Sequence, residues 1–199
     1  MASVEVQNVV KVYRRDAEEL RVLDGLSLTI ADGEFVALMG PSGSGKTTLL
    51  NLIGGVDQPT SGDLKVAGTN IARMKSNDLA RWRSVSIGYI FQLYNLIPVL
   101  TALENVELPL LLVKMSGAER RKRAETALQL VGLGDRVKHY PRQLSGGQEQ
   151  RVAIARALVS DPKVLLADEP TGDLDRKSAE DVLQLLDRLK RSSRRPSSW

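Results

Sequence analysis

The feature that most constrains this chain of 199 residues is a glycine-rich segment placed between an apolar stretch and a helical pattern. It fits G-x-x-x-x-G-K-[ST] in full, with Gly40, Pro41, Ser42, Gly43, Ser44, Gly45, Lys46 and Thr47. Residues 34–39 predict a strand before it, and the leucine-rich residues 49–53 predict a helix after it. In that context loop N–H groups, the helix start and the Lys46 ammonium converge on a phosphate, and the Thr47 hydroxyl can bind Mg²⁺. The alternative, a plain glycine turn, does not require this context.

Two adjacent carboxylates follow a second apolar stretch. Residues 163–167 predict a buried strand, and Asp168 and Glu169 come directly after it. At the carboxyl end of a parallel strand, beside a phosphate loop, Asp168 can hold Mg²⁺ and Glu169 can polarise an attacking water. A solvated strand end is the alternative interpretation.

A third motif begins a predicted helix that runs to about residue 159. After Leu144 it reads Ser145, Gly146, Gly147 and Gln148, and so offers a hydroxyl and free backbone N–H groups at a helix start. One triphosphate does not need two such sites from the same chain. We therefore expect two copies to face head to tail, so that each nucleotide lies between the Lys46 loop of one copy and the Ser145 loop of the other.

The remaining pattern predicts an α/β fold. Residues 4–13 and 22–30 predict a hairpin, and residues 63–67 and 85–91 predict further strands. Capping boxes predict helix starts at Thr101, with Glu104, and at Ser116, with Glu119; the second helix ends at Gly132. The last helix, 176–190, carries an apolar stripe of Ala179, Val182, Leu183, Leu186 and Leu189. Alternating strands and helices favour a mostly parallel sheet.

Composition excludes several classes of protein. The absence of cysteine excludes a disulfide framework and thiolate zinc sites. The net charge of +4 comes from the C-terminal residues 188–199, which contain five bases and no acid, so a nucleic-acid-binding face is not indicated. The uncharged run 84–103 contains Gly88, Gln92, Asn95 and Pro98, and does not predict a membrane span. The first residues lack the pattern of a signal peptide.

Taken together, the three motifs resemble the nucleotide-binding domain of an ABC transporter. The resemblance covers about residues 4–190. The segments 95–106 and 168–175 are similar to those of the subgroup that serves lipoprotein release and macrolide export. It implies a P-loop NTPase fold with a mostly parallel core sheet, an N-terminal antiparallel β subdomain and a helical signature subdomain at about 93–155. Residues 1–190 are then the nucleotide-binding domain, and 191–199 are expected to be a disordered basic tail.

The resemblance also implies roles for single residues. Glu169, Lys46 and Gln92 are the implied catalytic residues, and Thr47, Gln92 and Asp168 the implied Mg²⁺ ligands. Tyr13 would stack on adenine, unless it is a packing residue, and Gln92 is otherwise a polar loop residue. The implied ATP-binding residues are Tyr13, Gly40, Pro41, Ser42, Gly43, Ser44, Gly45, Lys46, Thr47, Thr48, Ser145, Gly146, Gly147 and Gln148. Asp175 matches a residue that communicates across the dimer in the family, and can also cap the next helix.

The implied function is that of an ATP-binding subunit. It would hydrolyse Mg·ATP in a head-to-tail homodimer and drive a separate membrane permease through the loop after Gln92, at the cytoplasmic face of the membrane and without nucleic acid. Residues 138–143 contain no acid, which favours a separate permease over a fused one.

The chain departs from the family pattern after the last predicted helix, which ends at about residue 190. The family continues with a strand and a switch histidine, whereas here the only histidine is His139, expected at the surface, and residues 191–199 contain no β-branched residue. The sequence therefore predicts a truncated C-terminus and impaired hydrolysis. Two alternatives follow: a nucleotide-binding module without turnover, and a DNA-repair-type ABC ATPase. The second is disfavoured because no heptad pattern lies between Lys46 and Ser145.

Overall fold

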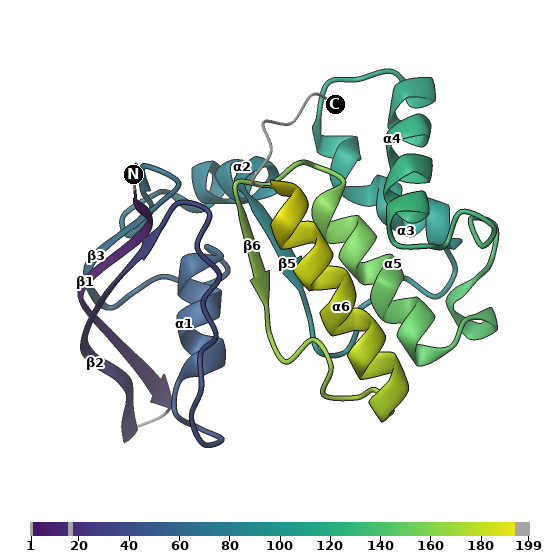
Figure 1. Ribbon diagram of the computed structural model, residues 1–199. Coiled ribbons are helices and arrows are strands. Elements are labelled where there is room, and N and C mark those ends of the chain that lie inside the picture. The colour runs from purple at the N-terminus through teal and green to yellow at the C-terminus, as the bar shows by residue number, and fades with distance from the viewer. Residues whose placement is uncertain (1, 16–17, 194–199) are drawn as a thin grey trace. The chain divides into compact units, whose positions relative to one another are not determined.

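A long antiparallel hairpin begins the chain, as predicted. β1 (Ala2–Arg15) pairs with β2 (Glu18–Ala31) along its whole length, and β3 (Ser61–Val66) and β4 (Thr69–Asn70) extend the sheet in the order β2-β1-β3-β4 (Figure 1). All pairings in this sheet are antiparallel. The computed structural model describes residues 2–15 and 18–193.

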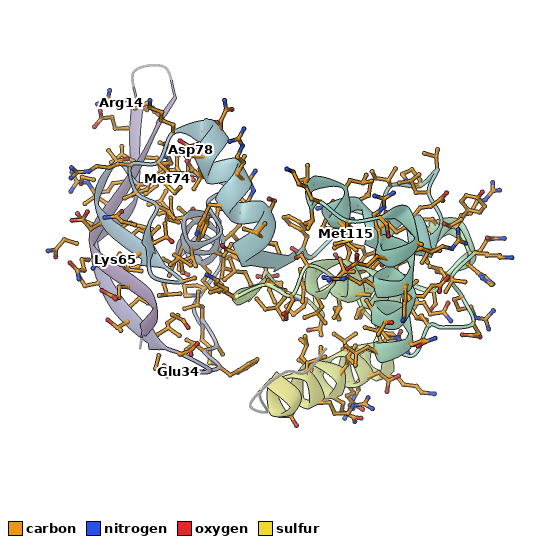
Figure 2. All side chains as sticks on the ribbon, turned by 90° about the horizontal axis from the view of Figure 1, so that it is seen from above. Arg14, Glu34, Lys65, Met74, Asp78 and Met115 are labelled. Atoms are coloured by element: carbon orange, nitrogen blue, oxygen red, sulfur yellow. The ribbon has the colours of Figure 1, made fainter. Side chains whose placement is uncertain are left out.

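The hairpin sheet has one buried and one exposed face. In β3 the buried Leu64 and Val66 alternate with Lys65, whose side chain points outward (Figure 2) and pairs with Glu5 across the sheet at 3.6 Å. Such a period of two is the normal consequence of the pleat.

A bulge in β1 changes which residues face inward. Val4 and Val6 are buried on even positions, but after a register shift between Val6 and Val9 the buried residues are Val9 and Lys11. Asn8 lies inside the shift and has φ 48°, a left-handed conformation. One extra residue in a strand moves every later side chain of that strand to the opposite face of the sheet. The bulge therefore places Lys11 and, by the same period, Tyr13 on the face to which Val9 belongs.

Gly62 is the residue that accommodates this bulge, and its replacement by Ala is expected to destabilise the fold by about 3 kcal/mol. Its φ is +93°, and a Cβ there would lie 2.5 Å from the Asn8 carbonyl oxygen and 2.7 Å from the Val9 Cα. Gly68→Ala is the matched control, because Gly68 has φ +77° but open space around it, and should cost about 1 kcal/mol. Urea unfolding measures both, and equal costs would show that the close approach contributes nothing.

The phosphate-loop helix follows the hairpin, but the strand predicted before it does not form. α1 (Lys46–Ile53) buries Leu49, Leu52 and Ile53 and lies alongside the four-stranded sheet (Figure 1). Residues 34–40 contain no strand, and the apolar side chains at 35, 36, 38 and 39 are exposed. The prediction of a strand over 34–39 was wrong, because strand formation needs a hydrogen-bonded neighbour and none of the strands in the described ranges pairs with this segment.

The chain divides between Arg83 and Ser84 into two compact units, and the second contains a short parallel sheet. β5 (Ile87–Ile90) pairs with β6 (Val164–Ala167) in parallel register, with Ile90 opposite Ala167. Both strands are shorter than the predicted 85–91 and 163–167. The helix α2 (Ser76–Ser86), which no sequence pattern predicted, precedes β5.

Helices make up the core of the second unit. This unit contains six helical segments: α3 (Ala102–Glu107), η1 (Leu108–Leu112), α4 (Gly117–Leu130), η2 (Pro141–Gln143), α5 (Gly146–Leu158) and α6 (Arg176–Ser193). Among them, α5 packs against β5, α3, α4 and α6 (Figure 1). The buried cluster joins Ile90 to residues of α3, α4, α5 and α6, with Val106, Leu128, Val152 and Ile154 fully enclosed. No helix in the described part of the chain combines the length and the apolar character that a bilayer crossing demands.

Most predicted helix ends are confirmed. Thr101 and Glu104 form the complete capping box, and Ser116 accepts the N–H of Glu119. The helix α4 ends at Leu130, with Val131 as its C-cap next to Gly132. In α6 the buried residues are Val182 and Leu185, whereas Leu183 is exposed, so the predicted stripe was wrong at that position because the helix packs through a face turned toward Leu185. α6 extends past the predicted end, and the remainder of the expected tail, 194–199, lies outside the described residues.

Candidate nucleotide site

The phosphate loop is exposed, and the helix α1 that follows it begins without a side-chain cap. Gly45 is the N-cap of α1 with φ 86°, and neither a side-chain cap nor an acidic residue is present in the first turn. A Cβ on Gly45 would lie 3.0 Å from Leu23 and 3.2 Å from the Val22 carbonyl, so a glycine is needed both for the backbone angle and for the approach to β2. The helix start thus offers its N–H groups to an anion.

Lys46 lies folded across its own loop. Its ammonium donates to the carbonyl oxygens of Gly40 at 2.8 Å and Pro41 at 2.9 Å. The Ser44 N–H donates to the Pro41 carbonyl at 3.3 Å and closes the turn. Two carbonyl contacts satisfy the ammonium only partly, because lysine has three donors. The arrangement holds the positive charge beside the loop N–H groups where a phosphate would bind.

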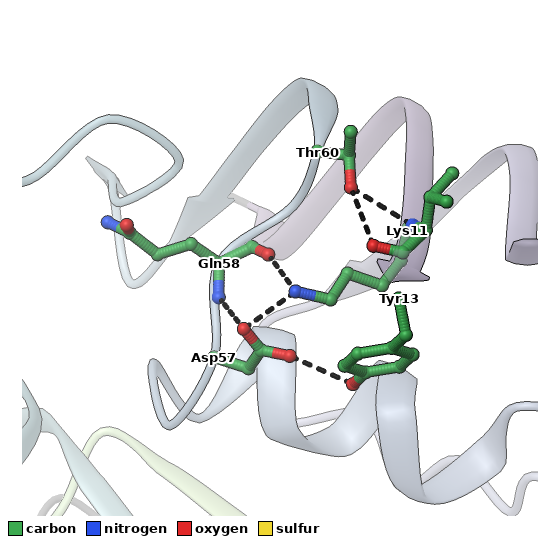
Figure 3. Close-up of polar contacts among 6 residues, drawn as sticks. Lys11, Tyr13, Asp57, Gln58 and Thr60 are labelled. Carbon is green, nitrogen blue, oxygen red and sulfur yellow. Dashed lines mark hydrogen bonds and ion pairs between the residues drawn. The ribbon is translucent and has the colours of Figure 1, made fainter. Parts of the chain in front are cut away.

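Tyr13 belongs to a polar cluster next to this loop (Figure 3). Its hydroxyl donates to Asp57 Oδ2 at 2.8 Å, while Lys11 Nζ donates to Asp57 Oδ1 at 2.7 Å and to the Gln58 carbonyl at 2.8 Å. A further hydrogen bond joins Tyr13 to the side chain of Thr48, on the phosphate-loop helix. The predicted residues Tyr13 and Thr48 are therefore brought together with Lys46 in the first unit.

Burial and hydrogen bonding set the charges of this cluster. Burial alone would raise the pKa of Asp57, but hydrogen bonds from Lys11, Tyr13 and the Gln58 backbone outweigh it, so the pKa of this carboxyl is lowered. The pKa of Tyr13 is raised by burial and by the hydrogen bond to Asp57. At neutral pH Asp57 is thus an ionised carboxylate that accepts hydrogen bonds and donates none, and the Tyr13 hydroxyl keeps its proton.

The paired carboxylates lie where the sequence placed them, directly after β6. The Asp168 N–H donates to the Ile90 carbonyl at 3.0 Å and extends the parallel ladder by one residue. Burial, and second the charge of Asp168, raise the pKa of Tyr89 on β5 to about 12. Glu169 is exposed and has φ 44°, and its carbonyl accepts the Gly172 N–H at 2.9 Å. A non-glycine residue in this left-handed conformation marks a tightly constrained turn.

Gln92 lies beside the turn that follows Glu169. It comes two residues after the end of β5, is exposed, and its Nε2 is 3.2 Å from the place where a Cβ on Gly172 would be. Because β5 and β6 are parallel neighbours, Gln92 and Asp168 leave the sheet at the same edge. The structure brings together the predicted Gln92, Asp168 and Glu169 in the second unit.

The residues predicted to hold Mg²⁺ have suitable donor chemistry. Thr47, Gln92 and Asp168 offer hydroxyl, amide and carboxylate oxygens, the atoms that Mg²⁺ prefers. Nowhere in residues 2–15 and 18–193 do three or more Asp, Glu, His or Cys side chains gather as a metal cage. Thr47 belongs to the first unit and Gln92 and Asp168 to the second, so their shared Mg²⁺ site stays a prediction.

The helix start at Ser145 is capped internally. The Gln148 N–H donates to Ser145 Oγ at 3.3 Å, and the Ser145 N–H donates to Gln148 Oε1 at 2.9 Å. The next two residues lie against neighbours in the same unit: a Cβ on Gly146 would be 3.0 Å from Tyr94 Oη, and one on Gly147 would be 2.9 Å from Ser178. Ser145 is exposed, and its hydroxyl proton remains able to donate to an anion.

Asp175 caps the last helix. Its carboxylate accepts the Ser178 N–H at 3.1 Å and the Ser178 hydroxyl at 2.6 Å, and these hydrogen bonds lower the pKa of Asp175. The capping interpretation is confirmed, and it leaves the expected role across a dimer as a prediction. His139, expected at the surface, is half-buried with a ring nitrogen 3.2 Å from Arg136.

Sequence reasoning missed three residues that hold these loops. Arg156 on α5 donates to the carbonyls of Tyr94 and Asn95, each at 2.6 Å, and the fully buried Gln150 donates to the Pro170 carbonyl at 2.6 Å. Asp57 holds Tyr13, as described above. Gln150 lies on the buried face of α5, where the other positions are apolar or small. A polar residue within this apolar pattern is the one sequence feature that could have indicated it.

Comparison with known proteins agrees with this geometry. Residues 23–172 match the ABC transporter family. The chain is 52% identical over 189 residues to the ABC transporter ATP-binding protein YvrO of Bacillus subtilis, covering 95% of this chain and 82% of that one. It is 50% identical to the macrolide export ATP-binding/permease protein MacB of Hyphomonas neptunium, covering 96% of this chain and 30% of that protein.

The fold is also that of a solved structure. The ATP-binding cassette MJ0796 of Methanocaldococcus jannaschii, solved as a dimer bound to ADP and phosphate, superimposes with a TM-score of 0.87 at 48% identity, covering 96% of this chain and 84% of that chain. The chain therefore belongs to the ABC transporter family, as an ATP-binding protein and ATPase of the type found in MacB and MJ0796. The predicted P-loop fold with its N-terminal antiparallel β subdomain is confirmed.

Proposed function

We propose that this chain binds and hydrolyses Mg·ATP between two head-to-tail copies and that the pair drives a separate membrane permease. The observation that carries the proposal is that each chain exposes two half-sites. One is the uncapped α1 start beside Lys46, and the other is the α5 start at Ser145. A solved relative, MJ0796, is a dimer with ADP and phosphate, which supports the same arrangement here.

The residue roles follow from where each group lies. The loop N–H groups and Lys46 would bind the phosphates, with Tyr13 under the base and the Ser145 loop of the second copy on the opposite side. Thr47, Gln92 and Asp168 would hold Mg²⁺, which neutralises phosphate charge. Glu169 would orient the attacking water and accept its proton.

The loop after Gln92 is the proposed contact with the permease. Leu93, Ile97 and Val99 are exposed there, which is unusual for large apolar residues that no partner covers. The chain would then sit at the cytoplasmic face of the membrane through its permease.

Cysteine cross-linking tests the head-to-tail arrangement, because the sequence contains no cysteine. Ser42→Cys and Ser145→Cys are introduced in separate copies that also carry Glu169→Gln, and the copies are mixed and oxidised with or without Mg·ATP. We expect a cross-linked heterodimer that depends on Mg·ATP, measured on a non-reducing gel.

The control is Ser116→Cys in place of Ser145→Cys. Both serines are exposed helix N-caps whose hydroxyl accepts the N–H three residues on, so the two variants lose the same cap. Lys46→Ala in the Ser42→Cys copy should remove the ATP dependence. Equal cross-linking through Ser116→Cys, or none with Mg·ATP, would contradict the arrangement.

A further inference from the structure

The Tyr13 ring is held on two sides by charged partners. Asp57 accepts the Tyr13 hydroxyl at 2.8 Å with one carboxylate oxygen, and accepts Lys11 Nζ at 2.7 Å and the Gln58 N–H at 2.7 Å with the other. Figure 3 shows all these contacts converging on the one carboxylate, between β1 and the segment that follows α1. Both oxygens are used as acceptors, so only an ionised carboxylate satisfies all three donors.

Lys11 covers one face of the ring. Its Nζ lies 4.7 Å from the ring centroid, and its side chain is only 11% exposed. A cation at this distance is attracted to the electron-rich face of an aromatic ring. Tyr13 nevertheless keeps 39% of its surface exposed, so the face turned away from Lys11 is the one left open to a ligand.

The cluster also sets where the open face lies relative to the phosphate loop. Tyr13 hydrogen-bonds to Thr48, two residues after Lys46 on the same helix. Asp57 follows α1 closely, and its backbone N–H donates to the Asn51 carbonyl on α1 at 3.2 Å. The ring is thus fixed to α1 at its hydroxyl end, and so to the helix whose start would bind the phosphates.

We propose that Asp57 and Lys11 are positioning residues that make Tyr13 a one-sided stacking platform for the base of the bound nucleotide. Lys11 closes one ring face, and Asp57 fixes the hydroxyl, so the base stacks on the opposite face at a set distance from Lys46. This inference rests on the proposed ATP site and adds to it the two residues that orient its base-binding half.

The test compares ATP with inorganic tripolyphosphate, which has the phosphates but no base. Calorimetric titration measures both affinities for wild type, Asp57→Asn and Tyr13→Phe. Tyr13→Phe removes the hydroxyl, and Asp57→Asn leaves one oxygen that cannot accept from both Tyr13 and Lys11, so each variant loosens the ring but keeps it. We expect each to weaken ATP binding about fivefold and to leave tripolyphosphate binding within about twofold. The double variant should be no weaker than either single one, because both act on the same contact.

Asp24→Asn is the matched control. Asp24 also forms an ion pair, with Arg21 at 2.8 Å, but its side chain is 71% exposed. Loss of the Asp24 carboxylate should change neither the affinity for ATP nor that for tripolyphosphate. Circular dichroism checks that each variant is folded, and Tyr13→Phe, at a partly exposed site, keeps the test valid if Asp57→Asn is not. Equal weakening of ATP and tripolyphosphate, or additive effects in the double variant, would overturn the inference. Failure of wild type to bind either ligand would instead overturn the proposed function, and this inference with it.

Discussion

Replacing Glu169 with Gln is expected to slow ATP hydrolysis about a thousandfold while ATP still binds. The amide has the size of the carboxylate but cannot accept a proton from water. The turn that carries Glu169 should be unchanged, because it is held by backbone contacts: the Gly172 N–H donates to the Glu169 carbonyl at 2.9 Å, and Gln150 donates to the Pro170 carbonyl at 2.6 Å. Phosphate release at saturating Mg·ATP measures the effect.

Glu180→Gln serves as the control for the Glu169 variant. Glu180 is a carboxylate of the same unit that pairs with Arg176 at 3.0 Å on the exposed surface of α6, and its replacement should leave turnover unchanged. A Glu169→Gln variant with turnover within tenfold of wild type would show that another group activates the water. If wild type releases no more phosphate than the variant, the chain is a nucleotide-binding module without turnover.

Replacing Arg156 with Met is expected to destabilise the second unit by about 4 kcal/mol. The guanidinium donates two short bonds, both 2.6 Å, to consecutive carbonyls of the loop after Gln92, and its burial lowers the pKa of Arg156. Tyr94 and Asn95 have φ of 33° and 50°, conformations that cost energy for residues with a Cβ and persist only when surrounding contacts impose them. Without the guanidinium the carbonyls lose their donors and the loop relaxes. Urea unfolding measures the loss.

Two further variants separate geometry from charge at Arg156. Arg156→Lys keeps the charge but cannot bridge both carbonyls with a planar fork, so it should retain about half of the stabilisation. Arg121→Met, on the exposed surface of α4, should change stability by less than about 0.5 kcal/mol, because exposed ion pairs such as that with Glu125 contribute little. A cost for Arg156→Met as small as that for Arg121→Met would show that the loop does not depend on this clamp.

Local sequence signals predicted the elements whose causes are themselves local. The hairpin follows from two β-branched runs, and the starts of α3 and α4 follow from Thr101 with Glu104 and Ser116 with Glu119, signals that need only a few consecutive residues. The strand expected over 34–39 has the right composition, yet it did not form, because a strand also requires a partner that the local sequence does not contain. The exposed Leu183 and the buried Leu185 show the same limit for helices, where packing decides which face turns inward.

The amino-acid sequence alone determined the chemistry of the phosphate loop, the paired carboxylates and the serine-capped helix start. Each is a run of adjacent residues, so the spacing along the chain already places the groups that would bind phosphate, Mg²⁺ or water. Tertiary structure alone decided what holds them in place. Asp57 is far from Tyr13 in sequence, and Arg156 is far from Tyr94, and only folding brings these donors and acceptors within 2.8 Å and 2.6 Å of each other. A hydrogen bond depends on distance and direction in space, and a bulge of one residue in β1 is enough to decide whether Tyr13 faces its partner.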